Sequence, residues 1–119
     1  MEFNQAVDNL LVGIGDDYTR WSSPLKTDEQ NMVDIKTRMI GEFKDGIKIR
    51  NGKKYVKVIT GSSVWGFIAK EDGVHKGIPH KKGDVFKAAG WRAPAKWARG
   101  SIFDDNQTWF HWTGPNYII

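Results

Sequence analysis

The hydrophobic pattern of this 119-residue chain changes at Gly46 from the period of a helix to the period of a strand. Before Gly46, apolar residues recur every three or four positions, as on one face of an amphipathic helix. After Gly46 they alternate with polar residues, as in a strand with one buried face. We therefore predict a single α+β domain over residues 1–119. Two N-terminal helices (1–45) pack on a small antiparallel β-sheet or open barrel of five to six strands (46–119).

The helical half divides at two glycines and a polar stretch. A first helix is predicted over residues 3–12, ended by Gly13 and Gly15, and residues 13–24 are expected to form a loop. A second helix is predicted over residues 28–44, with a capping box from Thr27 to Gln30 and a left-handed stop at Asp45-Gly46. The apolar stripe of the second helix consists of Met32, Ile35, Met39 and Phe43.

A hairpin opens the β-rich half. Asn51-Gly52 is typical of a two-residue type I′ turn, which would pair Arg50 with Lys53. That pairing assigns Ile47, Ile49, Val56 and Val58 to the core face of the sheet. It assigns Lys48, Arg50, Lys53, Tyr55 and Lys57 to the opposite face.

Later strands are expected over residues 64–69, 85–89, 101–103, 108–112 and 116–119. Gly66 is expected to mark a bulge or a close backbone approach. Residues 71–82 are expected to form a surface loop that carries His75 and His80. Residues 90–100 have no clean period and are expected to form a loop.

The net charge of +4 conceals a strongly basic middle of the chain. Residues 35–100 hold sixteen bases and five acids, whereas the segments on either side are acidic. Ten of the fifteen aromatic residues lie after residue 60, in or beyond this basic segment. A field of this kind steers polyanions such as nucleic acid, although lysines on an outer sheet face also serve solubility.

Several classes of chemistry are disfavoured by the residues present. The chain has no Cys, so thiolate catalysis, disulfides and Cys-ligated metals are excluded. His75 and His80 lack the spacing of a helical zinc site, and no phosphate-binding or dinucleotide-binding motif occurs. We expect no catalytic residues, no metal and no cofactor, and therefore a protein that is not an enzyme. We also expect no membrane span and no secretory signal.

Residues 90–100 concentrate two Trp, two Arg and one Lys around Pro94. Such a loop can present planar cations to phosphates and indole rings to bases. Alternatively, the two indoles are buried lids over the end of the barrel, covered by the arginines through cation–π contacts. The candidate binding residues are thus a basic β-face (Lys48, Arg50, Lys53, Lys57) and a Trp/Arg loop (Trp91, Arg92, Lys96, Trp97, Arg99).

The C-terminal half resembles small uncharacterised proteins encoded by tailed bacteriophages. The similar segments are residues 64–67, 82–95, 98–100 and 112–115, which read VWGF, KGDVFKAAGWRAPA, ARG and WTGP. The resemblance implies a phage origin and the host cytoplasm as the place of action. It implies no activity and assigns a role to no residue.

Three functions remain open from the sequence. The leading hypothesis is a non-enzymatic phage accessory protein that binds nucleic acid through the basic β-face and the Trp/Arg loop. The second is an anti-defence or host-takeover protein that binds and inhibits a host protein through its acidic N-terminal helices or an exposed Trp patch. The third is a binder of a small anionic ligand such as a nucleotide, held by Arg92 and Arg99. The oligomeric state stays open.

Overall fold

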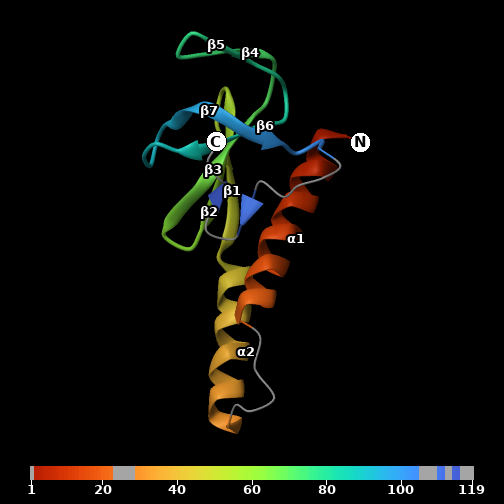
Figure 1. The fold of residues 1–119 in the computed structure, drawn as a ribbon, viewed down its shortest axis with the longest axis vertical. Coiled ribbons are helices and arrows are strands. Elements are labelled where there is room, and N and C mark those ends of the chain that lie inside the picture. The colour runs from red at the N-terminus through yellow and green to blue at the C-terminus, as the bar shows by residue number, and fades with distance from the viewer. Residues whose placement is uncertain (1, 23–28, 105–109, 112–113, 116–119) are drawn as a thin grey trace.

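The computed structural model describes residues 2–22, 29–104, 110–111 and 114–115 (Figure 1). Helices α1 (Phe3–Ser22) and α2 (Gln30–Asp45) come first, and strands follow. The strands are β1 (Ile47–Asn51), β2 (Tyr55–Thr60), β3 (Ser63–Ala69), β4 (Gly73–His75), β5 (Ile78–His80), β6 (Asp84–Ala88), β7 (Pro94–Ser101), β8 (Phe110–His111) and β9 (Gly114–Pro115). The predicted α+β class with two N-terminal helices is confirmed.

Five strands form one antiparallel sheet in the order β1-β2-β3-β6-β7. Strands β4 and β5 form a separate two-stranded sheet, and β8 pairs with β9. Among the described strands, β1 and β7 are the edges of the main sheet, which is therefore open. Helix α1 runs along one face of this sheet, and the β4–β5 hairpin stands at the opposite end of the molecule from the tip of α2 (Figure 1).

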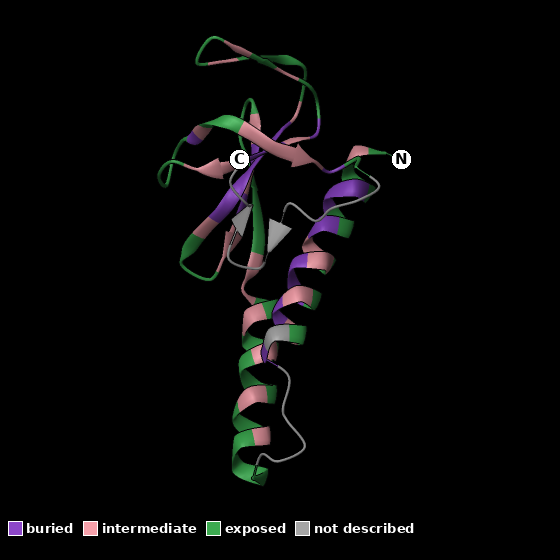
Figure 2. Cartoon of the chain, viewed as in Figure 1, coloured by how far each residue is buried: buried purple, intermediate pink, exposed green. Residues whose placement is uncertain are grey.

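The main core lies between α1 and the sheet. The buried residues of α1 face the strands (Figure 2). The cluster consists of Ala6, Val7, Leu10, Ile14, Val56, Val58, Trp65, Ile68, Val85 and Ile102, all at most 3% exposed. Burying such a set of apolar side chains is the principal source of stability in a domain of this size.

Helix α1 continues through both glycines to Ser22, so the predicted end at Gly13 and the predicted loop over residues 13–24 are wrong. Leu10, Ile14 and Tyr18 extend the apolar stripe at intervals of four residues, and all three are buried. A glycine inside a helix costs about 1 kcal/mol, which the burial of two further large side chains outweighs. The Thr19 hydroxyl donates to the Gly15 carbonyl oxygen at 2.8 Å. Residues 23–24 lie outside the described part of the chain.

Helix α2 begins at Gln30 rather than at residue 28, and its N-cap is Glu29, which makes no side-chain capping hydrogen bond. The Gln30 amide donates forward along the helix to Asp34 Oδ1 at 3.0 Å, so it does not return to the cap as predicted. Thr27 lies outside the described residues. At the other end, Gly46 has φ −83° and is right-handed, so the predicted left-handed stop is wrong. Instead, the Gly46 carbonyl accepts a hydrogen bond from Gly61 N at 3.0 Å, which ties the helix end to the sheet.

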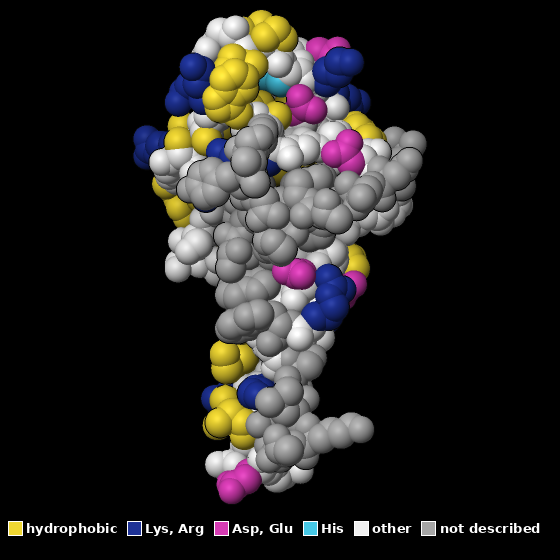
Figure 3. All heavy atoms as spheres, viewed as in Figure 1, with side chains coloured by type: hydrophobic (Ala, Val, Ile, Leu, Met, Phe, Trp, Pro, Cys, Tyr) yellow, Lys and Arg dark blue, Asp and Glu magenta, His cyan; other side chains and the backbone are white. Residues whose placement is uncertain are grey.

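Helix α2 contacts the body mainly through its C-terminal half, where Phe43 stacks on Tyr18 with ring centroids 4.0 Å apart. Its other stripe residues, Met32, Ile35 and Met39, are 40–42% exposed. Hydrophobic side chains accordingly show along the free side of the helix in Figure 3. No helix in the described residues is long and apolar enough to cross a membrane.

The β1–β2 hairpin forms with a register other than the predicted one. Arg50 pairs with Lys57, not with Lys53, and Gly52 N donates to Tyr55 O at 2.9 Å. Neither Asn51 nor Gly52 has a positive φ, so the predicted type I′ turn is wrong. The register differs from the prediction by an even number of residues, so the assignment of side chains to the two faces survives.

Two details of the sheet bear on the sequence predictions. The prediction that Ile49 lies in the core is wrong, because Ile49 is on the edge strand β1 and is 41% exposed. The expected irregularity at Gly66 is confirmed, because Val58 pairs with Gly66 and Ile59 with Val64. Trp65 is the extra residue of this bulge, and its side chain is buried in the main core.

Residues 71–82 form a hairpin, β4–β5, rather than a loop. Lys76 and Gly77 have φ of 51° and 80°, as both central positions of a type I′ turn require. His75 and His80 are half-buried rather than surface residues. Their rings lie 5.9 and 6.0 Å from that of Tyr55 and pack on Phe86 as well.

The segment predicted as the Trp/Arg loop is a turn followed by a strand. Residues 89–92 form the turn, and β7 then pairs with β6 through two irregularities of register. Strand β7 ends at Ser101, and the strand expected at 101–103 is a turn there. The strand expected over residues 108–112 is described only as β8, and residues 116–119 lie outside the described part of the chain.

Candidate functional site: a cationic groove on the open sheet face

Helix α1 covers one face of the sheet, and the opposite face carries the basic residues. Across the strands, Arg50 lies beside Lys57, Lys57 beside Phe67, and Phe67 beside Phe86. Directly opposed residues of antiparallel strands point to the same side. The predicted common face of Lys48, Arg50, Tyr55 and Lys57 is confirmed by this register.

A groove of about 310 Å³ opens on this face, and we call it the cationic groove. It lies between the β1–β2 turn and the turn that joins β6 to β7. Its lining residues are Arg50, Asn51, Gly52, Lys53, Lys54, Tyr55, Lys57, Phe67 and Arg92. Five of these nine residues are cationic, and no carboxylate is among the described lining residues.

The cations of the groove are available to a ligand. Within the described residues, neither Arg50 nor Arg92 forms a salt bridge with a carboxylate. Arg92, Lys53 and Lys54 are exposed on turns. In Figure 3, dark blue Lys and Arg side chains flank hydrophobic side chains along the left margin of the sheet body. Lys53 and Lys54 also line a neighbouring hollow that holds Glu71 and Asp72, so the attraction of the groove for an anion depends mainly on Arg50, Lys57 and Arg92.

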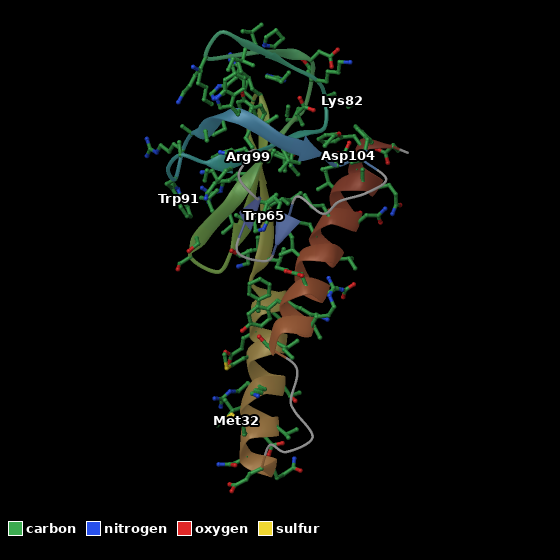
Figure 4. All side chains as sticks on the ribbon, in the orientation of Figure 1. Met32, Trp65, Lys82, Trp91, Arg99 and Asp104 are labelled. Atoms are coloured by element: carbon green, nitrogen blue, oxygen red, sulfur yellow. The ribbon has the colours of Figure 1, made fainter. Side chains whose placement is uncertain are left out.

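Trp91 stands beside the groove on the turn between β6 and β7 (Figure 4). Its side chain is 48% exposed. The Lys57 ammonium lies 4.8 Å from the centre of the Trp91 ring and 5.9 Å from that of Phe67, so one cation contacts both aromatic side chains. The alternative that Trp91 and Trp97 are buried lids is wrong, because Trp97 is also exposed, at 53%.

An aromatic layer forms the floor of the groove and continues under the β4–β5 hairpin. Phe67, Ala69 and Phe86 make up this second, smaller core cluster, and Tyr55 packs against it. The Tyr55 ring meets Phe67 and Phe86 edge to face at 6.2 and 5.9 Å. Burial raises the pKa of the Tyr55 phenol above its ordinary value of 10.0. The floor is therefore largely aromatic and uncharged at neutral pH.

The structure brings together only part of the predicted set. Arg50, Lys53, Lys57 and Arg92 line the groove, and Trp91 adjoins it through Lys57. Lys48 shares the face but is not a lining residue. Lys96 and Trp97 form a separate pair on β7, with the ammonium 5.5 Å from the ring centre. Arg99 is half-buried and occupies the bulge between the Phe86–Ala98 and Val85–Gly100 pairs.

Sequence reasoning missed five lining residues: Asn51 and Gly52, which it assigned only to the turn, and Lys54, Tyr55 and Phe67. Lys54 has no assigned role in the sequence prediction because the predicted two-residue turn places it inside a strand. Tyr55 is assigned to the correct face but not to a site. The alternation of side chains along β3 could have assigned Phe67 to one face of the sheet. Only the pairing of β3 with β2 shows that Phe67 lies beside Lys57 on that face.

These groups can recognise an anion. Lysine and arginine donate hydrogen bonds to phosphate or carboxylate oxygens, and none of the lining side chains is an activated nucleophile. His75 and His80 face the aromatic layer, where His75 Nε2 lies 3.2 Å from the Pro94 carbonyl oxygen. Among the described residues, no three His, Asp or Glu side chains gather as metal ligands would.

Comparison with known proteins adds a family but no activity. Residues 15–118 match DUF7717, described as a family of unknown function. No curated protein and no solved structure matches the chain.

Proposed function

Because the chain belongs to DUF7717, a family of unknown function, we propose its role from the groove itself: a non-enzymatic protein that binds nucleic acid. One observation carries the proposal. Among the residues that the structure describes, five cations and no carboxylate line one groove on the sheet face opposite α1, and an exposed indole stands beside it. A polyanion with aromatic bases is complementary to both features.

Binding would proceed through phosphate contacts. Arg50 on β1 and Arg92 on the turn between β6 and β7 both line the groove, and each can hold phosphate oxygens with two parallel hydrogen bonds. Lys53 and Lys54 add flexible point charges from the β1–β2 turn. Each phosphate that a cation neutralises releases condensed counterions, so affinity falls steeply with salt. Such contacts position the strand and read little sequence.

A fluorescence anisotropy titration tests this proposal. Labelled single-stranded and double-stranded DNA and RNA are titrated with the protein at about 50 and 200 mM salt. We expect saturable binding that weakens with salt. The double variant Arg50→Gln/Arg92→Gln should flatten the slope of log K against log salt by about 1.4–1.8, or about 0.7–0.9 per lost phosphate contact.

A matched control removes two arginines elsewhere. Arg20 and Arg38 lie on α1 and α2, where they are about 70% exposed and pair with Asp17 and Glu42 at 3.3 and 3.8 Å. The variant Arg20→Gln/Arg38→Gln has the same net charge as the groove variant, and it should retain the slope of the unaltered protein. Absence of binding at the lower salt, or equal effects of the two double variants, would refute the proposal.

Protein binding is a second candidate, and the exposed stripe of α2 favours it. Met32, Ile35 and Met39 present unbranched and branched apolar side chains on a helix with no buried residue. Methionine-rich surfaces adapt to partners. A pull-down from nuclease-treated lysate tests this candidate: a stoichiometric partner that Met32→Lys/Met39→Lys loses would support it, and capture unaffected by those substitutions would contradict it.

The resemblance of the C-terminal half to proteins of tailed bacteriophages leads us to propose in addition that the protein is encoded by a phage and acts in the host cytoplasm. The sequence predicts that Arg92 and Arg99 would hold a small anionic ligand. The groove supports Arg92 together with Arg50 for such a ligand, because both line it and Arg99 does not.

A further inference from the structure

We propose that the cationic groove takes single-stranded nucleic acid, with one unpaired base stacked on Trp91. This inference rests on the proposed function and specifies its substrate class. It is carried by the juxtaposition of an exposed indole with the cations, which a binder of phosphates alone would not need.

The indole lies next to the phosphate-binding groups. Trp91 directly precedes Arg92 on the turn between β6 and β7, and Arg92 lines the groove. Lys57 connects the two, because it lines the groove and its ammonium lies 4.8 Å from the centre of the Trp91 ring. A phosphate held by Lys57 and Arg92 therefore brings its own nucleotide within reach of the indole.

The size of the groove favours one nucleotide unit over a duplex. A volume of about 310 Å³ is at the lower end of the range of small-ligand sites. All five cations line this one hollow. At the floor the half-buried Tyr55 ring offers a small apolar surface to a sugar, whereas Phe67 is only 3% exposed.

Along its length a duplex offers the indole no open base face. Its bases are stacked on one another inside the helix, and its exterior offers phosphates, sugars and groove edges. An unpaired base presents a π face, and its stacking on an aromatic side chain strengthens binding by about 5-fold to 150-fold. Trp91 is half-exposed and thus has ring surface for this contact. Lys57 acts as a positioning residue, since a phosphate is a stronger partner for its ammonium than the indole.

The test compares three ligands with the same number of phosphates. These are a single-stranded oligonucleotide with bases, a strand of abasic residues and a short duplex, each measured by anisotropy at about 50 mM salt. We expect the strand with bases to bind about 5-fold to 150-fold more tightly than the abasic strand. Trp91→Ala should abolish this difference.

Trp97→Ala is the matched control. Trp97 is similarly exposed and also carries a lysine over its ring, but it does not line or adjoin the groove. It should retain the difference between the strands with and without bases. Thermal unfolding of both variants checks folding, and Trp91→Phe should keep part of the preference because a phenyl ring still stacks.

The outcomes separate this inference from the function on which it rests. If the unaltered protein binds all three ligands equally, or if Trp97→Ala loses the preference and Trp91→Ala keeps it, the stacking role is overturned and phosphate binding stands. If none of the ligands binds, the proposed function fails as well. A base-dependent gain that only Trp91→Ala removes supports the inference.

Discussion

Replacing Gly83 with alanine should destabilise the protein strongly, for two separable reasons. Gly83 has a φ of +92°, a conformation that side chains rarely adopt. Its backbone links three segments, because its N–H donates to the Ala69 carbonyl and its carbonyl accepts from Ile102 N, both at 2.9 Å. A β-carbon at this position would lie 2.5 Å from Phe103 Cε2 and 3.2 Å from Ile102 Cγ1.

The magnitude follows from these two effects. The positive φ costs about 1–2 kcal/mol for a residue with a side chain. Displacing the Phe103 ring adds about 1–3 kcal/mol, as overpacking typically does. The free energy of unfolding should therefore fall by about 2–5 kcal/mol. Gly77 is the matched control, since it has a φ of +80° and a β-carbon there would meet nothing within 4 Å, so Gly77→Ala carries only the cost of the positive φ.

Urea unfolding followed by circular dichroism measures both variants. Gly83→Ala should be less stable than Gly77→Ala by about 1–3 kcal/mol. Adding Phe103→Ala to Gly83→Ala should recover part of this difference, because the ring that clashes is gone and Phe103 is itself 40% exposed. Equal stabilities of the two glycine variants, or no recovery in the double variant, would refute the steric argument.

Two further predictions concern the cores. Leu10→Ala should lower the free energy of unfolding by about 2–5 kcal/mol because Leu10 is fully buried between α1 and the sheet, whereas Val12→Ala, at a residue 62% exposed, should change it by less than about 0.5 kcal/mol. Similar losses in urea unfolding for the two variants would contradict the position of the core. Ultraviolet titration should show Tyr55 ionising above pH 10.0, and Tyr55→Phe should remove that transition. Since the unfolded chain releases the phenolic proton first, stability should fall as pH rises from 10.0 toward the raised pKa, and Tyr55→Phe should reduce that fall. A Tyr55 transition at or below pH 10.0 would contradict the burial argument.

Sequence patterns over a few residues predicted the secondary structure correctly where no contact from a distant part of the chain opposed them. The switch of period at Gly46 separates the helices from the sheet, as expected. The alternation after Gly46 assigns Lys48, Arg50 and Lys57 to one face despite an incorrect turn, because the error in register is even. The expected bulge at Gly66 is also present, because a glycine in a strand often marks one.

Local signals failed where packing opposed them. Gly13 and Gly15 do not end α1, because the side chains of Ile14 and Tyr18 are buried when the helix continues past Gly13. The loop expected at residues 71–82 forms a hairpin because Tyr55 and Phe86 provide an aromatic surface on which His75 and His80 pack. Tyr55 is about twenty residues or more from both histidines, so a short window around residues 71–82 does not contain this partner.

The candidate site shows the same division between sequence and tertiary structure. The composition and spacing of the chain by themselves determined that a basic strand face and a segment rich in Trp and Arg exist, since both depend on residue identity and alternation. Only the tertiary structure decided that Arg92 and Arg50 line the same groove, that Trp91 adjoins it and that Trp97 is not among its lining residues. The physical reason is that strand order and the irregular pairing of β6 with β7 set these distances, and both arise from contacts between residues far apart in the chain.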